Sequence, residues 1–360
     1  MQGAALFLIS MLFSFGLGFP IHRLLLRWNV IDRPNSRSSH QDVTARGGGL
    51  AIMAGVFAGF AWLLSQRPGP MLSGLFSAVL VLAIVSWFDD IRSVRPLARF
   101  LCQALVAVTA LYALDWPAVS IGLSAGSTVS LPAGIGLGMA FLWLTGYTNA
   151  FNFMDGINGL AAGQAAVTGF GSAVLAGLAS GRWTEPAVVF AAVVAGAAAG
   201  FLPHNFPRAR MFMGDVSSAP LGFLLAFLAL WLARDCGWWL LLPLSLLHAN
   251  FVLDTGLTLG RRILRGERWY EAHREHFYQR LIQAGKSHSF VTGWELALQT
   301  IVLLLMLLYL YSRPAARVVL VGAVLLLWGT FFVYCERSFR RECSGNRREL
   351  LAASVRPLAG

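Results

Sequence analysis

Charged residues are scarce in this chain of 360 residues: they make up 12% of it, whereas an average soluble domain carries about a quarter. This scarcity excludes a water-soluble globule. Hydrophobic residues account for 57% and recur in long runs along the whole length, so the chain is not a soluble domain with a single membrane anchor. The four cysteines form no CxxC pair and no regular framework, which gives no indication of a metal cluster or a disulfide scaffold.

Apolar windows separated by charges, glycine and proline predict an all-α polytopic membrane protein with about 10–11 transmembrane helices. Residues 1–335 are expected to form one multi-span domain, followed by a basic tail at 336–360. The stretch 115–134 is rich in Ser, Gly and β-branched residues and predicts a short outer hairpin. A run of small residues at 191–200 would allow close helix packing. The predicted spans are 3–25, 48–65, 70–88, 100–115, 133–150, 160–180, 186–202, 216–234, 238–260, 294–312 and 317–335.

Basic residues are distributed unevenly between the two sets of alternate loops. One set holds 23 of the 28 Lys and Arg residues and the other set holds five. Because cytoplasmic loops carry the excess of Lys and Arg, we expect the first set to be cytoplasmic, the N-terminus outside and the C-terminus inside. The net charge of +11 lies mainly in these membrane-flanking loops, so it favours an anionic substrate or lipid surface over nucleic acid.

Two adjacent carboxylates, Asp89 and Asp90, end an apolar window and precede Arg92, Arg95 and Arg99. An acidic pair of this kind can hold a divalent cation or act as a base, and arginines offer bidentate contacts to phosphate. A helix cap with solvated charges is the alternative interpretation. Since acids near membrane depth normally line a polar cavity or have a partner, this pair is a candidate site.

Amide and carboxylate side chains gather in the segment TNAFNFMDGINGLAAG. Asn152, Asp155 and Asn158 follow one another at intervals of three, and Asn149 precedes them by the same interval. On a helical or turn-like path their oxygens would converge. A turn rich in Asx and Gly, without a function, is the alternative.

A Gly-Asp pair opens the apolar window that begins near residue 216, after a segment that contains His204 and Asn205. Asp215 is a candidate metal ligand, with Gly214 allowing the backbone to bend. The alternative is that Asp215 is only an N-cap for the following helix.

The last large inner loop, residues 261–281, predicts one amphipathic helix with Trp269 on its apolar side. His273, His276 and Arg280 follow at i, i+3 and i+7, a row that would suit hydrogen bonding to a pyrophosphate. A zinc site is disfavoured because no third ligand stands at a recognisable spacing. A basic interfacial helix that touches anionic lipid remains an alternative.

Two ionisable residues, His248 and Asp254, lie within the predicted span 238–260. Asp254 is a candidate structural partner of the pocket, and membership of a buried, satisfied polar pair is the role that we favour. A second hypothesis uses both residues as a proton relay in a secondary transporter of an anionic solute. Because no internal repeat is apparent and the polar motifs cluster in one set of loops, an enzyme is favoured over a transporter.

Together these motifs resemble those of the polyprenyl-phosphate N-acetylhexosamine-1-phosphate transferases, membrane enzymes of glycosyltransferase family 4 type that begin cell-envelope glycan synthesis. The resemblance implies transfer of sugar 1-phosphate from a UDP-N-acetylhexosamine to undecaprenyl phosphate in the bacterial inner membrane, with release of UMP. It also implies a requirement for Mg2+, with Mn2+ as an alternative ion. The matching motifs run in family order: RPNSRSSH with RGGGLAI at 33–52, FDDIRSVRPLARF at 88–100, NAFNFMDGINGLAAGQ at 149–164, MFMGDVSS at 211–218 and HREHFYQRL at 273–281.

The resemblance further implies roles for individual residues. Asn152 and Asp215 would coordinate the metal ion on the donor pyrophosphate. Asp89, Asp90 and Asp155 would form the catalytic set, in which Asp89 and Asp90 serve the acceptor phosphate and one of them is a candidate base. The residues implied in substrate binding are Arg99, Asn149, Asn158, Asn205, His273, Arg274 and His276.

The chain departs from one branch of this family in the last loop. Relatives that transfer phospho-MurNAc-pentapeptide carry a run of histidines there, whereas this chain has His273-Arg274-Glu275-His276. The departure favours a plain UDP-N-acetylhexosamine, such as UDP-GlcNAc or a 6-deoxy derivative, and an O-antigen-type or related envelope glycan. The resemblance leaves the oligomeric state open, with a homodimer among the alternatives.

Overall fold

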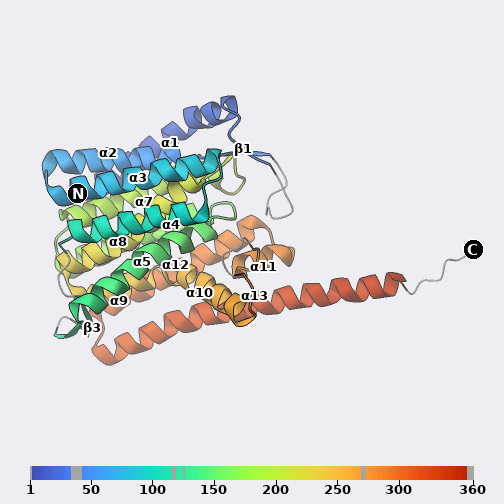
Figure 1. Cartoon of the computed structure of the whole chain (residues 1–360). Helices are drawn as coiled ribbons and strands as arrows, with labels where there is room; N and C mark the ends of the chain where they lie inside the picture. The colour runs from blue at the N-terminus through green and yellow to red at the C-terminus, as the bar shows by residue number, and fades with distance from the viewer. Residues whose placement is uncertain (1, 34–42, 116–118, 125, 269–272, 355–360) are drawn as a thin grey trace, which may run out of the picture.

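A computed structural model gives the fold and describes residues 2–33, 43–115, 119–124, 126–268 and 273–354 (Figure 1). The predicted all-α polytopic membrane architecture is confirmed. Within the described residues, eight helices are long and apolar enough to cross a membrane, or nine spans if one bent pair is counted. The helices are α1 (Gln2–Arg27), α2 (Leu50–Gln66), α3 (Pro70–Ile91), α4 (Pro96–Ala113), α5 (Ala133–Met154), α6 (Leu160–Ser180), α7 (Pro186–Asn205), α8 (Asp215–Cys236), α9 (Leu241–Leu246), α10 (Ala249–Leu264), α11 (Phe277–Gln283), α12 (His288–Tyr311) and α13 (Pro314–Ser354).

Each predicted span coincides with a helix or with the bent pair. Two of the predicted spans are not among these nine. They correspond to α2, an apolar helix of 17 residues, and to α5, a helix of 22 residues. Proline begins several of the helices, as Pro70 does in α3 and Pro186 in α7. Its fixed φ suits the first helical position, where no backbone N–H is needed. Gly181 ends α6 in the left-handed conformation, with φ of +69°.

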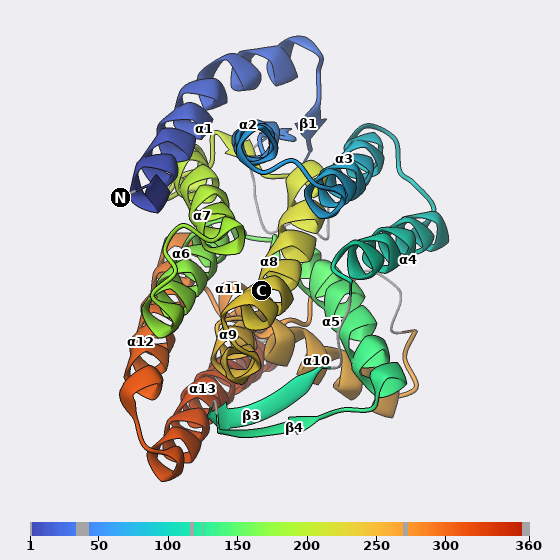
Figure 2. The same ribbon diagram turned by 90° about the vertical axis from the view of Figure 1, so that its left-hand side faces the viewer.

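Helix α8 lies at the centre of the bundle, surrounded by the other long helices (Figure 2). At the periphery, α1 packs closely against α7. A Cβ atom on Gly196 would lie 2.2 Å from the carbonyl oxygen of Phe7, and one on Gly200 would lie 2.1 Å from that of Met11. The small-residue stretch at 191–200 therefore has the close-packing role that the sequence predicts.

The two ends of the bundle differ. At one end lies the hairpin formed by β3 (Ser120–Ser124) and β4 (Ser127–Ser130), an antiparallel pair that confirms the predicted hairpin (Figure 1). The opposite end carries α11 and a three-stranded sheet that the sequence analysis did not predict. Its strands are β1 (Ile31–Asp32), β2 (Thr44–Arg46) and β5 (Met211–Phe212), with β2 antiparallel to β1 and parallel to β5.

One predicted span is broken. The 3-10 turn Trp238–Leu240 with α9 forms one arm and α10 the other, and the two arms meet at an angle of 68°. A break frees backbone groups, which need partners where water is absent. The carbonyl oxygen of Leu247 at the break accepts hydrogen bonds from Gln164 (3.0 Å), Thr168 (3.1 Å) and Gln299 (2.6 Å). Side chains of α6 and α12 therefore hold the bend in place.

The prediction of one amphipathic helix over residues 261–281 is wrong. Helix α10 ends at Leu264, because Gly266 adopts a φ of +68°, and residues 273–276 are not helical. His276 is instead the N-cap residue of the short helix α11, where its backbone N–H donates to the side-chain oxygen of Gln279 at 3.2 Å. Trp269 and most of the RPNSRSSH motif lie outside the described residues. The predicted tail continues α13 as far as Ser354.

We expect Gly196→Val to destabilise the protein by about 1–3 kcal/mol, because the new side chain would overlap the α1 backbone. Thermal unfolding of the purified protein in detergent measures the change. Gly322→Val is the matched control, since a Cβ atom there meets nothing within 4 Å. Equal melting temperatures for the two variants would contradict the close contact of α1 with α7.

Candidate active site

Asp90, in the last turn of α3, caps the beginning of α8. Its carboxylate accepts hydrogen bonds from the backbone N–H groups of Asp215 (2.9 Å) and Val216 (2.8 Å). The first N–H groups of a helix have no partner within the helix, so a carboxylate at this position satisfies them. Gly214 permits the approach: its φ is +77°, and a Cβ atom there would lie 2.7 Å from Asp90 Oδ2. The Asp90 side chain is 0% exposed.

Arg46 joins this cap to the neighbouring carboxylate. Its Nε donates to Asp90 Oδ1 at 2.7 Å and its Nη2 donates to Asp215 Oδ2 at 3.2 Å. The arginine reaches this place because strand β2 ends at Arg46 and pairs with β5, which immediately precedes α8. Arg46 was not among the predicted site residues, although the RGGGLAI motif that begins with it was a signal. Gly48 and Gly49 extend the pairing through hydrogen bonds to residues 212 and 213.

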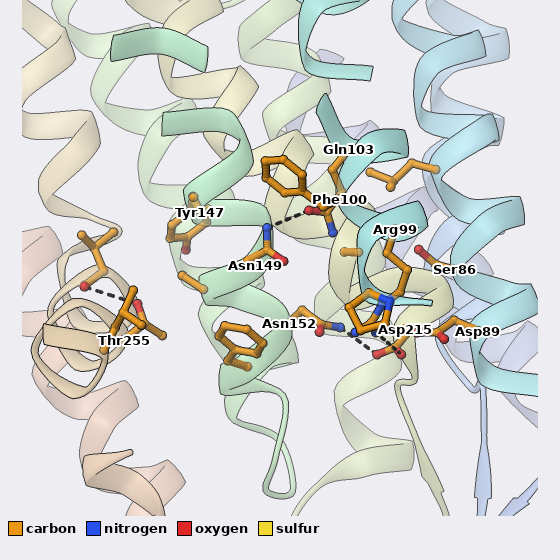
Figure 3. A pocket seen from close by; sticks show the side chains of 18 of the residues that line it. Ser86, Asp89, Arg99, Phe100, Gln103, Tyr147, Asn149, Asn152, Asp215 and Thr255 are labelled. Carbon is orange, nitrogen blue, oxygen red and sulfur yellow. Dashed lines mark hydrogen bonds and ion pairs between the residues drawn. The ribbon is translucent and has the colours of Figure 1, made fainter. Parts of the chain in front are cut away.

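Two further groups meet Asp215 on the other side (Figure 3). The Asn152 side-chain amide donates to Asp215 Oδ1 and to the Ser218 hydroxyl, both at 2.7 Å. Arg99 Nη1 lies 2.5 Å from Asp89 Oδ2 and 3.8 Å from Asp215 Oδ2. Residues from α3, α4, α5 and α8, far apart in the chain, thus converge at one end of the bundle.

Asp155 follows α5 directly and lies close to this cluster. It is partly buried, and within the described residues its carboxylate accepts no hydrogen bond and forms no ion pair. Burial raises the pKa of Asp155 to about 8, and the negative charge of Asp215 acts in the same direction, whereas Arg46 opposes it. In the absence of a bound cation this carboxyl group is therefore largely protonated at neutral pH.

His273 and His276 approach the cluster from the segment before α11. Their ring centroids are 4.9 Å apart. His276 Nδ1 lies 2.9 Å from Asp254 Oδ1, and Asp254 also accepts hydrogen bonds from backbone N–H groups at the start of α11. This arrangement confirms Asp254 as a buried structural partner. Burial lowers the pKa of His273 to about 4, with a contribution from the positive charge of His276, so His273 is neutral at pH 7.

A cavity of about 810 Å³ adjoins this cluster and is lined by some of its residues (Figure 3). Its walls are mainly apolar and come from α3, α4, α5 and α10, with residues such as Leu97, Phe100, Leu142 and Val252. Its polar end contains carboxylates, amides, an arginine and two histidines. The predicted site residues that line it are Asp89, Arg99, Asn149, Asn152, Asp215, His273 and His276.

Comparison with known proteins agrees with this arrangement. Residues 72–233 match the family model described as Glycosyl transferase family 4. The decaprenyl-phosphate N-acetylglucosaminephosphotransferase of Mycobacterium tuberculosis is 31% identical over 296 residues, which cover 75% of this chain and 73% of that protein. The chain belongs to glycosyl transferase family 4. The resemblance to the polyprenyl-phosphate N-acetylhexosamine-1-phosphate transferases is thereby confirmed.

Two other relatives show the breadth of family 4. A probable undecaprenyl-phosphate N-acetylglucosaminyl 1-phosphate transferase of Bacillus subtilis is 31% identical over 294 residues, 78% of each chain. A phospho-N-acetylmuramoyl-pentapeptide-transferase of Synechococcus elongatus is 30% identical over 309 residues, 72% of this chain and 79% of that protein. Similarity alone therefore does not select between the two branches.

Several predicted site residues of this family 4 protein do not line the cavity. Among the described residues that line it, Asp90, Asp155, Asn158, Asn205 and Arg274 do not occur. Asn205 is buried: its Oδ1 accepts from the Gly159 N–H at 2.7 Å, and its Nδ2 donates to the Met211 carbonyl at 2.9 Å.

Asn158 Nδ2 donates to the Pro207 carbonyl at 3.2 Å. Both asparagines thus fix the turn after α5, and their contact with a substrate stays a prediction. Arg280 does not continue the row of histidines: it donates to Glu336 of α13 at 2.5 Å.

We expect Asp90→Asn to lower the free energy of unfolding by about 1–3 kcal/mol, because one amide oxygen replaces two acceptors in a buried site that supplies three donors. Asp89→Asn is the matched comparison. It keeps an acceptor for the Val94 N–H and weakens one ion pair to a partly exposed arginine, so its effect is smaller. Melting temperatures in detergent test this order, and a larger loss in Asp89→Asn would contradict the capping role of Asp90.

The pKa of Asp155 predicts a dependence of stability on pH in EDTA. Because its folded pKa is raised to about 8, the folded state binds more protons than the unfolded state between about pH 4 and pH 8. The melting temperature of the wild type should therefore fall through this window relative to that of Asp155→Asn, and the difference should level off above pH 8. Parallel pH profiles for the two proteins would show that Asp155 titrates normally.

Proposed function

We propose that the chain transfers N-acetylhexosamine 1-phosphate from a UDP-sugar to undecaprenyl phosphate and releases UMP. The observation that carries this proposal is the cavity, in which apolar walls lead to a polar end formed by Asp89, Arg99 and Asp215. Such a space fits a lipid whose head group is a phosphate. The mycobacterial and Bacillus relatives are named as transferases that act on decaprenyl and undecaprenyl phosphate, which supports the same conclusion.

The donor set of the polar end fits Mg2+, with Mn2+ as an alternative. Asp215 supplies a carboxylate beside Asn152, whose amide nitrogen is turned to Asp215 and Ser218, so that its oxygen is the remaining ligand atom. In the described residues no three His, Cys, Asp or Glu side chains converge as a metal site of their own. Mg2+ commonly takes one or two carboxylates together with water and substrate phosphates, so Asn152 and Asp215 are the residues that would hold it. When bound, it would neutralise phosphate charge during transfer.

Different residues of the cavity would contact the two substrates. Arg99 offers a cation to the acceptor phosphate, while Asp89 lines the cavity beside it and is the candidate base or orienting group. Asp90 is a positioning residue, because its carboxylate already accepts hydrogen bonds from Arg46 and from the start of α8. His273, which is neutral, is available as a hydrogen-bond donor to the nucleotide sugar. We favour direct attack by the acceptor phosphate, a nucleophile that alignment and electrostatics can activate.

The last loop supports the choice of donor. His273 and His276 both line the cavity, whereas the residues between them are Arg274 and Glu275. Without a longer run of histidines, we propose a plain UDP-N-acetylhexosamine such as UDP-GlcNAc as the donor. The lipid-diphosphate sugar would then initiate an O-antigen or related envelope polysaccharide.

The arrangement of the bundle supports a cytoplasmic site. The basic loops at 92–99, 208–210 and 261–286 adjoin the helix ends that form the polar cluster, and the hairpin lies at the opposite end (Figure 1). By the positive-inside rule this end faces the cytoplasm of the bacterial inner membrane. The N-terminus would then be outside and the C-terminus inside.

The test is release of labelled UMP from UDP-GlcNAc by the purified protein in detergent with undecaprenyl phosphate and Mg2+. We expect Asp89→Asn and Asp215→Asn to reduce turnover by about 100-fold or more, because each removes a charged group from the reacting end. Glu342→Gln, a change at an exposed position of α13, is the control with wild-type turnover expected. Other UDP-sugars, with the lipid product identified by mass spectrometry, define the donor.

Two outcomes would contradict the proposal. Full turnover by a folded Asp215→Asn protein would contradict the assignment of Asp215 as a ligand of the metal ion. Uptake of an anionic solute into vesicles, without any lipid-linked sugar, would favour the transporter hypothesis.

A further inference from the structure

Two polar side chains that are hydrogen-bonded to each other lie in the apolar part of the cavity, and the proposed function gives this pair no role. Gln103 of α4 and Asn149 of α5 face each other across the cavity wall, one helical turn deeper in the bundle than Arg99 (Figure 3). Leu97, Phe100, Leu142 and other apolar side chains line the same space. A polar group at such a place is costly unless it has a partner.

The hydrogen bonds of this pair fix the orientation of both amides. Asn149 Nδ2 lies 2.8 Å from the carbonyl oxygen of Thr145, which can only accept, so the Asn149 nitrogen is the donor there. The same nitrogen lies 2.7 Å from Gln103, and the atom that it meets must therefore be the acceptor Oε1. Gln103 Nε2 is thus turned away from Asn149, and within the described residues it donates to no protein group.

The position of Gln103 on α4 gives this unused donor a direction. Gln103 follows Arg99 by four residues, so the two side chains share one face of the helix and both line the cavity. Arg99 lies at the polar end, within 3.8 Å of the Asp215 carboxylate. An anionic head group beside Arg99 with oxygens that extend one turn deeper would meet Gln103 Nε2, and its hydrocarbon tail would meet the apolar wall.

We propose that Gln103 Nε2 donates a hydrogen bond to a phosphate oxygen of the lipid acceptor, and that Asn149 is the positioning residue that holds the Gln103 amide in this orientation. The pair sets how deep the phosphate sits relative to Arg99 and therefore favours a phosphorylated polyprenol over the free alcohol. This inference rests on the proposed function, whose acceptor it refines.

The experiment compares wild type, Gln103→Leu and Gln103→Glu in two measurements. In the transfer assay, we expect Gln103→Leu to raise the KM for undecaprenyl phosphate about 10-fold, as the loss of one charge-assisted hydrogen bond implies, and to leave the KM for the UDP-sugar unchanged. Gln103→Glu should raise it further, because a carboxylate repels the phosphate. Gln66→Leu, an exposed change at the end of α2, is the control.

The second measurement does not need turnover. The shift in melting temperature caused by undecaprenyl phosphate, without a UDP-sugar, should shrink in both Gln103 variants. The shift caused by undecaprenol should be the same in all proteins. Gln103→Asn, which withdraws the amide by one methylene, gives a milder variant should the leucine protein not fold.

The outcomes separate this inference from the proposed function. If a folded Gln103 variant has wild-type acceptor KM and a wild-type lipid-induced shift, the inference is overturned. If the wild type transfers no sugar from any UDP-sugar, the proposed activity is wrong. The shift in melting temperature caused by undecaprenyl phosphate still decides whether Gln103 binds the phosphate. An equal loss of the undecaprenol and undecaprenyl phosphate shifts would also overturn the inference, since it would show a general packing defect.

Discussion

The candidate site depends on one interaction, the capture of the first N–H groups of α8 by the carboxylate of Asp90. The same carboxylate binds Arg46, which also reaches Asp215. Three segments that are distant in sequence, β2, the end of α3 and the start of α8, are thereby joined at one point. Because Asp215 is the first residue of α8, fixing the helix end also fixes the group around which Arg99 and Asn152 assemble.

The second constraint is the broken span. A straight helix at 238–260 would satisfy its own backbone, whereas the 68° bend exposes the carbonyl oxygen of Leu247 to partners from α6 and α12. The bend directs α10 along the cavity, where Val252 and Leu259 form part of the apolar wall. Asp254 of the same helix caps α11 and holds His276. One break in a helix thus shapes the apolar wall and also positions the histidine segment.

Sequence reasoning predicted the helices well because each is a long apolar run, and the cost of burying polar groups in lipid leaves few alternatives. It also brought Asp89, Asn152 and Asp215 to one end through the distribution of arginines, and the structure places them together. It could not assign different roles to Asp89 and Asp90. Adjacent residues on a helix point in different directions, and only the packing of the neighbouring helices shows which of the two faces the cavity. The last loop was mispredicted as a helix because its periodicity outweighed one signal, Gly266, whose positive φ ends α10.

Arg46 and the β2–β5 pairing were missed for a different reason. Two or three residues of strand carry no periodic pattern, and their partner lies more than 160 residues away, so only the three-dimensional structure reveals the register. Gln103 was missed because a single glutamine in an apolar helix gives no motif. Its environment becomes informative only when the Thr145 carbonyl fixes the direction of the neighbouring amide.

The central position of α8 has a consequence for how the chain enters the bilayer. The whole apolar window of this helix is enclosed by protein, yet its mean hydropathy of 2.0 equals that of α1, whose window is only 17% buried. Contact with lipid in the finished molecule therefore does not account for the apolar character of α8. During synthesis each helix partitions from the insertion machinery on its own hydrophobicity, before its neighbours assemble around it. The composition of α8 thus reflects its biogenesis, and its final neighbours are other helices on every side.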